Sequence, residues 1–290
     1  MKRLNFLSVF AVVALSIGML FTSCKTEEPD PYEGKTDPST IATANLVAYF
    51  PLESATGAIE TGTGITYGKL SGAGTFAVGR RGNSYKGSTA PGYLEFNVVT
   101  AANLFKSMTE YTYAAWIKCP KPTDGAATAF ALNGGDANMG NLNFIVESGS
   151  NADSLALKSY LYNSTTNWKG QDFYLHNKAF LSDKWVHIVS SYNKTTSTMT
   201  YYANGVLVKT QIKYADGEVG GVQPKLGALT FGSDMTKLDI GAWPKLAAGT
   251  ATDSWMVYYP GLIDEIRIYN KALTDAEVKA LYDAEITVIN

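Results

Sequence analysis

The sequence is poor in the side chains that bind transition metals and form disulfides. Its 290 residues include two cysteines, Cys24 and Cys119, and two histidines, His176 and His187. A zinc site of the usual kind needs three or four such ligands together, so these numbers argue against one. No serine or cysteine stands in a nucleophile motif such as G-x-S-x-G, and this familiar sign of a hydrolase is therefore missing.

The chain also lacks runs of basic residues. It carries 24 lysines and arginines against 26 aspartates and glutamates. Loss of residues 1–23 would remove Lys2 and Arg3 and leave 22 basic side chains, for a net charge of −4. A mildly acidic chain without a basic patch has little attraction for a phosphate backbone, so nucleic acid is not expected as a partner.

The first 24 residues have the pattern of a secretory signal. Lys2 and Arg3 precede an apolar stretch from Leu4 to Phe21, and small residues then lead to Cys24. This ending resembles a bacterial lipobox, which implies that Cys24 is acylated and becomes the new N-terminus. The alternatives are a plain signal peptide or a transmembrane anchor, for which the apolar stretch is short and uneven. We expect residues 1–23 to be a lipoprotein signal peptide.

Residues 24–44 are expected to form a flexible tether. The stretch KTEEPDPYEGKTDPST is polar and acidic and contains three prolines, so it cannot bury a core. The run CKTEEPD resembles the export signal of Bacteroidetes lipoproteins. That resemblance implies an outer-membrane lipoprotein exposed at the cell surface, with membrane lipid as a partner through Cys24.

Residues 45–290 are expected to form one β-rich domain. Apolar and polar residues alternate in TYAAWIKC and WVHIVSSY, and Asn204-Gly205 separates two further alternating runs. Asn-Gly between such runs is a strong signal for a type I′ hairpin. The exception is LTDAEVKALYD, where Thr274 and Glu277 have the spacing of a capping box, and Leu273 and Val278 that of a hydrophobic staple. A short helix is therefore predicted at the end of the chain.

Several segments, in this order, resemble laminin-G-like, concanavalin A-like jelly-roll domains. They are LVAYFPLESATG, GRRGNSYKGSTAPGYLEF, YTYAAWIKCP, KWVHIVSSYNKTTSTMTYYANGVLVKT, LDIGA and YPGLIDEIRIYNKALTDAEVKALYD. The resemblance implies an all-β sandwich of two antiparallel sheets with a short C-terminal helix, and often a carbohydrate ligand. The fold hosts lectins, hydrolases, lyases and adhesive modules, so it does not define one activity.

The adjacent acids Asp264 and Glu265 do not form a glucanase centre. Retaining hydrolysis needs two carboxylates about 5–5.5 Å apart, whereas neighbours on a strand point to opposite faces. We expect Glu265 to pair with Arg267 on one face and Asp264 to lie on the packed side with Ile266 and Ile268. There Asp264 needs backbone amides, a basic side chain or a structural Ca²⁺ ion, for which it is a candidate ligand. A catalytic site whose residues come from separate strands remains an alternative.

Three tryptophans are candidate platforms for a sugar. Trp168, Trp243 and Trp255 lie in polar, glycine-bearing segments, where functional residues concentrate. Trp116 and Trp185 fall in the strand motifs and are expected in the core. Each candidate could equally close a loop onto the sandwich. Polar groups near the first candidate are Asn167, Gln171 and Asp172.

The sequence favours a non-catalytic, carbohydrate-binding surface lipoprotein that retains a polysaccharide or other glycan at the outer membrane. One alternative is a polysaccharide lyase or hydrolase of the same fold. Another is a protein-binding adhesion module, which a flat apolar patch in place of a polar aromatic cleft would favour.

Overall fold

The computed structural model describes residues 36–60, 62, 64–98, 102–164, 168–171, 175–216, 218–232 and 234–286. The predicted signal peptide, Cys24 and the first part of the predicted tether lie outside these residues. Within them, no helix is both long enough and apolar enough to cross a membrane.

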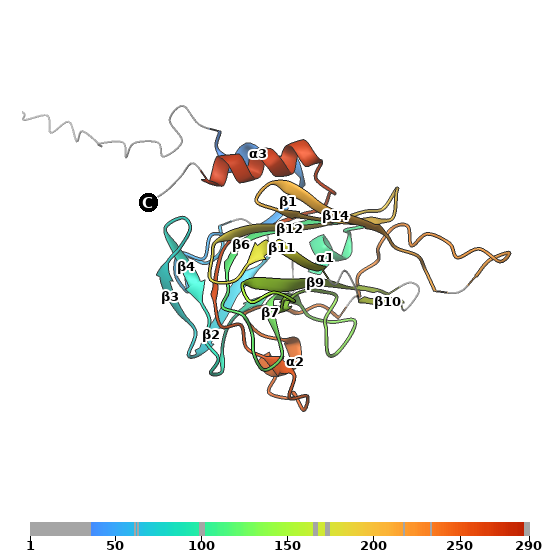
Figure 1. Cartoon of the computed structure of the whole chain (residues 1–290). Helices are drawn as coiled ribbons and strands as arrows, with labels where there is room; N and C mark the ends of the chain where they lie inside the picture. Colours follow the sequence, from blue (N-terminus) through green and yellow to red (C-terminus); the bar gives the residue numbers. More distant parts are fainter. Residues whose placement is uncertain are drawn as a thin grey trace, which may run out of the picture.

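Two β-sheets stack face to face (Figure 1). The first has eight strands, in the order β14 (Val206–Ile212), β13 (Thr198–Ala203), β12 (Val186–Asn193), β6 (Tyr111–Lys118), β17 (Leu262–Tyr269), β4 (Asn83–Lys86) and β3 (Thr75–Val78), with β1 (Leu46–Phe50) also paired to β17. The second has nine, in the order β10 (Trp168–Gln171), β9 (Ser154–Asn163), β8 (Leu142–Ser148), β7 (Ala126–Leu132), β15 (Lys237–Ile240), β5 (Gly92–Asn97) and β2 (Thr66–Gly72), with β11 (Leu175–Leu181) on β9 and β16 (Met256–Val257) on β7.

The strand pairs of the described chain are antiparallel apart from the parallel pair β16–β7. The described residues also form five helical segments: η1 (Pro38–Thr40), η2 (Thr43–Asn45), α1 (Ala102–Lys106), α2 (Pro244–Ala247) and α3 (Asp275–Ile286). Figure 1 shows α3 on the outer side of the eight-stranded sheet and α2 on the opposite side of the sandwich. The predicted all-β sandwich with a short C-terminal helix is confirmed.

Alternation along the strands builds the core between the two sheets. On β6, Tyr113 and Ile117 point inward, and the Tyr113 ring stacks on Phe144 of β8 with 5.1 Å between centroids. Trp116, between them in sequence, points outward and stacks on Tyr282 of α3 at 5.7 Å. Because successive side chains of a strand alternate, each sheet also presents an outer face that something else must cover or leave open.

The predicted hairpin and the predicted helix cap are both confirmed. Asn204 and Gly205 have φ values of 50° and 74°, as a type I′ turn between β13 and β14 requires. At α3, Glu277 accepts a hydrogen bond from the Thr274 amide at 2.8 Å, and the Thr274 hydroxyl accepts one from the Glu277 amide at 3.2 Å. These reciprocal bonds are the capping box, which satisfies two amides that the first turn leaves unpaired.

The folded region begins before residue 45. Pro38 of η1 is buried, and Ile41 is 9% exposed in an apolar cluster with Val278 and Leu281 of α3. Burial of an isoleucine side chain contributes about 1.5–3 kcal/mol toward holding this stretch against the helix. The end of the predicted tether is therefore packed on the domain.

Buried charges fasten α3 to the outer face of the eight-stranded sheet. We call Trp116, Glu265, Arg267 and Glu285 the α3 clamp; each is at most 2% exposed. The Arg267 guanidinium lies 3.0 Å from Glu265 and also pairs with Glu285, which accepts a hydrogen bond from the Trp116 indole at 2.7 Å. Burial alone would lower the pKa of Arg267, but Glu285 and Glu265 raise it overall, so the guanidinium stays charged.

Replacing Glu285 with glutamine should destabilise the protein by about 3–5 kcal/mol, because it leaves a buried guanidinium short of one counter-charge. Urea unfolding followed by circular dichroism measures this loss. The matched control is Lys279→Ala, which removes a 2.5 Å pair with Asp283 between two half-exposed side chains of the same helix. That change should cost about 0.5 kcal/mol or less. Equal losses for the two variants would contradict a stabilising role for the clamp.

Candidate functional site

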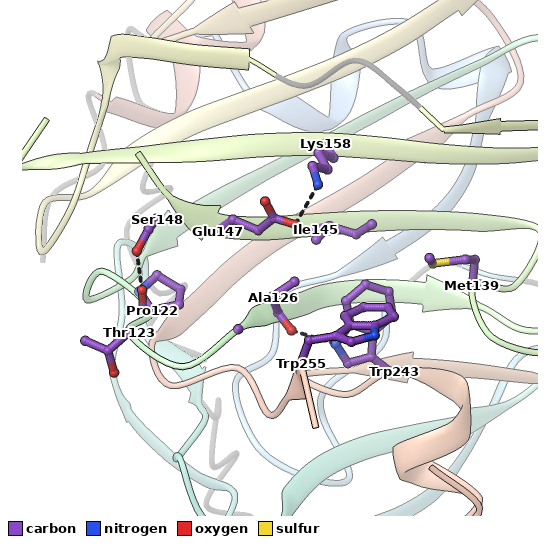
Figure 2. Close-up of a pocket in the computed structure, with 11 residues that line it drawn as sticks. Pro122, Thr123, Ala126, Met139, Ile145, Glu147, Ser148, Lys158, Trp243 and Trp255 are labelled. Carbon is purple, nitrogen blue, oxygen red and sulfur yellow. Dashed lines mark hydrogen bonds and ion pairs between the residues drawn. The ribbon is translucent and has the colours of Figure 1, made fainter. Parts of the chain in front are cut away.

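A pocket of about 470 Å³ lies on the outer face of the nine-stranded sheet (Figure 2). Strands β7, β8 and β9 form its floor. The loop that precedes β7 and the segments around Trp243 and Trp255 form its walls. Its volume falls within the range of about 300–1,000 Å³ that is typical of small-molecule sites.

The floor is a direct result of strand alternation. On β8, Phe144 and Val146 point into the core, whereas Ile145 and Glu147 line the pocket. On β9, Lys158 lines the pocket opposite Ile145. An isoleucine, a lysine and a glutamate are thus brought together by pairing of two consecutive strands.

Lys158 and Glu147 form an ion pair on this floor. The lysine ammonium lies 2.7 Å from the carboxylate, and both side chains are 22% exposed. At that exposure both groups remain reachable from the pocket. The pair therefore offers hydrogen-bond donors and acceptors side by side with no net charge.

Two tryptophans form the wall beside α2. The rings of Trp243 and Trp255 meet edge to face, with 5.2 Å between centroids and an interplanar angle of 87°. Trp243 is fully buried, and its indole donates to the Ala126 carbonyl at 2.8 Å. Trp255 is 39% exposed. The buried ring therefore supports the exposed one, an arrangement that fixes the orientation of Trp255.

Gly125 allows the Trp255 segment to close on β7. The Trp255 carbonyl accepts a hydrogen bond from the Ala126 amide at 2.8 Å. A Cβ atom at Gly125 would lie 2.2 Å from the same carbonyl oxygen, so only glycine permits this approach. The position of the exposed tryptophan thus depends on a glycine in the neighbouring loop.

The rim opposite the tryptophans is polar. Thr123 is exposed, and the Ser148 hydroxyl donates to the Pro122 carbonyl, which ties the end of β8 to the loop before β7. The pocket therefore combines one aromatic wall, an ion pair on the floor and hydroxyl groups at the edge.

The predicted platform residues divide into three outcomes. Trp255 is exposed in the pocket, as expected of a platform. Trp243 is in the pocket wall but buried, so the expectation that it is itself an exposed platform is wrong; its ring packs under Trp255 and against apolar neighbours. Trp168 and Gln171 belong to β10, which pairs with β9, but their side chains are not described, and Asn167 and Asp172 lie outside the described residues.

Sequence reasoning missed the floor of the pocket. The sequence analysis singles out none of its three residues, Ile145, Glu147 and Lys158. The sequence signal for this floor is a charged residue within a largely apolar run: Glu147 in FIVES and Lys158 in LALKSY. Such a charge marks the outer face of a strand, but the pattern does not show that the two strands are neighbours.

Asp264 is fully buried, as expected, but the expectation that it lies on the inner face with Ile266 and Ile268 is wrong. Ile263 and Ile266 are both in the core, so two residues rather than one separate consecutive inward positions. Glu265 has a φ of 52°, and the pairing with β6 is irregular between Asp264 and Arg267. This bulge interrupts the alternation and places Asp264 opposite the outward-facing Trp116. The predicted pairing of Glu265 with Arg267 is confirmed at 3.0 Å.

Amide groups surround the Asp264 carboxylate. One of its oxygens accepts hydrogen bonds from the Arg80 and Arg81 amides at 2.7 and 3.0 Å, and the other accepts one from the Glu265 amide at 2.9 Å. Hydrogen-bond donors repel a cation, so this environment fits the structural alternative better than a calcium ligand. No group of three or more acidic, histidine or cysteine side chains that could hold a metal occurs among the described residues.

A second acid pair lies on the outer face of the nine-stranded sheet. Asp239 of β15 stands directly opposite Glu95 of β5, and Lys237 bonds to Glu95 at 2.7 Å. Asp239 is only 2% exposed, and within the described chain its Oδ1 has no hydrogen-bond partner. Burial, and then repulsion from Glu95, raises the pKa of Asp239 well above its usual range. This is an acid pair assembled across strands, but neither Asp239 nor Glu95 lines the pocket.

Comparison with known proteins agrees with the fold. Residues 92–235 match the Laminin_G_3 family, described as the concanavalin A-like lectin/glucanases superfamily. This match covers just under half of the 290 residues, and it agrees with the resemblance that the sequence motifs suggested. A search of curated proteins found no match.

Solved structures of the same fold come from an enzyme and from toxins. Domain 4 of AbnA, a GH43 extracellular arabinanase from Geobacillus stearothermophilus in complex with arabinotriose, aligns over 82% of this chain and 98% of its own, with a TM-score of 0.51 and 18% identity. The binding domain of botulinum neurotoxin serotype D aligns with a TM-score of 0.52 and 12% identity. This chain spans about half of that toxin chain, since the alignment covers 82% of the former and 51% of the latter. At such low identity the likeness shows the fold alone.

Replacing Asp239 with asparagine should stabilise the protein near pH 7 by about 1–3 kcal/mol, because it removes a buried carboxyl that must otherwise stay protonated or lie uncompensated. A carboxyl whose pKa is raised by folding destabilises the folded state increasingly as the pH rises above about 3.9. The advantage of Asp239→Asn should therefore shrink toward pH 4. Thermal melts across this range test it, with Asp216→Asn as an exposed control. An advantage that grows on acidification would contradict this account.

Proposed function

We propose that the protein is a non-catalytic carbohydrate-binding protein whose ligand occupies the pocket on the nine-stranded sheet. The observation that carries this proposal is the half-exposed Trp255 ring set beside the Lys158–Glu147 ion pair. A flat aromatic surface and a cluster of donors and acceptors face the same cavity.

The chemistry of a sugar matches this combination. One face of a pyranose or furanose ring is a surface of C–H groups, which packs on an aromatic ring, while the hydroxyls at its edge both donate and accept hydrogen bonds. Lys158 supplies donors and Glu147 supplies acceptors at adjacent positions. Because the pair is neutral as a unit, it suits neutral sugars better than strongly charged ones.

The pocket favours binding over hydrolysis. Retaining and inverting glycosidases both need two carboxyl groups flanking the bond that is cleaved. Glu147 is the single carboxylate among the described lining residues, and it is already paired with Lys158. The lining is also a polar aromatic cleft rather than a flat apolar patch, which favours a glycan over a protein as the ligand.

Two structures with the same fold support a sugar ligand. The arabinanase domain was solved with arabinotriose, and another matching structure reports that cell entry of botulinum neurotoxin type C depends on two ganglioside molecules. We further propose that Cys24 is acylated and anchors the domain to the outer membrane at the cell surface. The basic start, the apolar stretch and the acidic tether of the sequence support this placement, where the protein would retain glycan for other proteins to process.

Replacing Trp255 with alanine should weaken glycan binding at least about tenfold, or 1.4 kcal/mol, because the sugar loses its apolar platform. A glycan array identifies ligands, and calorimetry then compares the affinities of the two proteins. Tyr214→Ala is the matched control, since Tyr214 is a similarly exposed aromatic residue (41% against 39%) after β14 on the other sheet.

Unchanged affinity in the Trp255 variant would place the site elsewhere. Incubation of each ligand with the wild-type protein, followed by chromatography of the products, completes the test. Shortened products would overturn the non-catalytic part of the proposal.

A further inference from the structure

A second, smaller pocket adjoins the first. It has a volume of about 110 Å³, and Pro122 and Thr123 line both pockets. The loop before β7 therefore borders both cavities. Trp255 lines the larger cavity and Tyr258 the smaller one.

One short segment supplies an aromatic ring to each cavity. Trp255 and Tyr258 flank β16, which pairs with the start of β7 and so anchors the segment that carries both rings. Trp255 ends a turn, and Tyr258 follows the two strand residues Met256 and Val257. The two rings line different cavities, so a ligand that contacts both must span the loop between them.

The second cavity has its own polar groups and a fixed ring. Thr89 and Asp124 are exposed at its edge, and Val257 contributes apolar surface. The Tyr258 hydroxyl donates to the Leu246 carbonyl of α2 at 3.5 Å, a long contact that limits rotation of the ring. An apolar surface beside hydroxyl and carboxylate acceptors repeats, on a smaller scale, the chemistry of the first pocket.

We propose that the two pockets are consecutive subsites of one groove, and that the ligand is a neutral oligosaccharide of at least two residues lying across Pro122 and Thr123. This inference rests on the proposed function. The charges select the class of sugar: Lys158 is neutralised by Glu147 at 2.7 Å, so the exposed Asp124 leaves the groove with an excess of negative charge. Uronic acids and sulfated sugars are repelled by such a groove.

The test is the dependence of affinity on chain length. Calorimetry would compare arabino-, xylo- and cello-oligosaccharides of one to six residues, with oligogalacturonates of the same lengths as acidic probes. Affinity for the neutral series that binds should rise at least tenfold between one and three residues. Acidic probes should bind the wild-type protein more weakly and gain affinity in Asp124→Asn.

Variants at the second cavity separate the two subsites. Tyr258→Ala should reduce the affinity for the trisaccharide to near that for the monosaccharide and leave the monosaccharide affinity unchanged. Tyr258→Phe keeps the ring and should keep the affinity. Thr89→Arg, a change at an exposed position, should block the second cavity and reproduce the effect of Tyr258→Ala even if the latter variant folds poorly.

The possible failures are distinguishable. If affinity does not depend on length, or if Tyr258→Ala and Thr89→Arg leave trisaccharide binding unchanged, the two-subsite groove is wrong while a Trp255-dependent sugar site still stands. If none of the neutral probes binds at any length and the glycan array is also negative, the proposed function itself fails, and the groove with it.

Discussion

Contact between the inner faces of the two sheets is the constraint on which the rest of the structure depends. Tyr113, Phe130 and Phe144 meet there with 5.1 Å between ring centroids, and the strands alternate so that each sheet commits one face to this core. The alternate side chains, which point away from this core, form the outer face of each sheet. What covers each outer face decides whether it is structural or available to a ligand.

The two outer faces are covered to different extents. On the eight-stranded sheet, α3 covers the face, and the α3 clamp fills the space beneath it with paired charges and an indole. On the nine-stranded sheet, the short helix α2 and Trp243 cover only part of the face. The remaining part, between Trp255 and the Lys158–Glu147 pair, is the pocket. A ligand site therefore exists where the covering layer stops.

The acidic residues also differ in whether they are buried in the fold or line the pocket. Glu265 and Glu285 are buried with Arg267, and Asp239 is buried opposite Glu95. Burial disfavours the charge of Asp239, Glu265 and Glu285 and raises the pKa of each. A raised pKa is often a sign of a catalytic acid, but here each of these three groups is at most 2% exposed and lies outside the pocket lining. Glu147, the carboxylate that does line it, is paired with a lysine. Exposure to the pocket, rather than a raised pKa, distinguishes the carboxyls that can contact a ligand from those that stabilise the fold.

The sequence by itself determined the features that depend on neighbours along the chain. Alternation of apolar residues indicated the strands, Asn204-Gly205 indicated the hairpin, and Thr274 with Glu277 indicated the capped helix, because each signal is complete within a few residues. Tertiary structure decided the rest. The bulge at Glu265 turned Asp264 outward, Trp243 became a buried support, and the pocket joined segments near residues 123, 147, 158 and 255. Strand order places those segments together, and strand order is set by long-range pairing that no local pattern encodes.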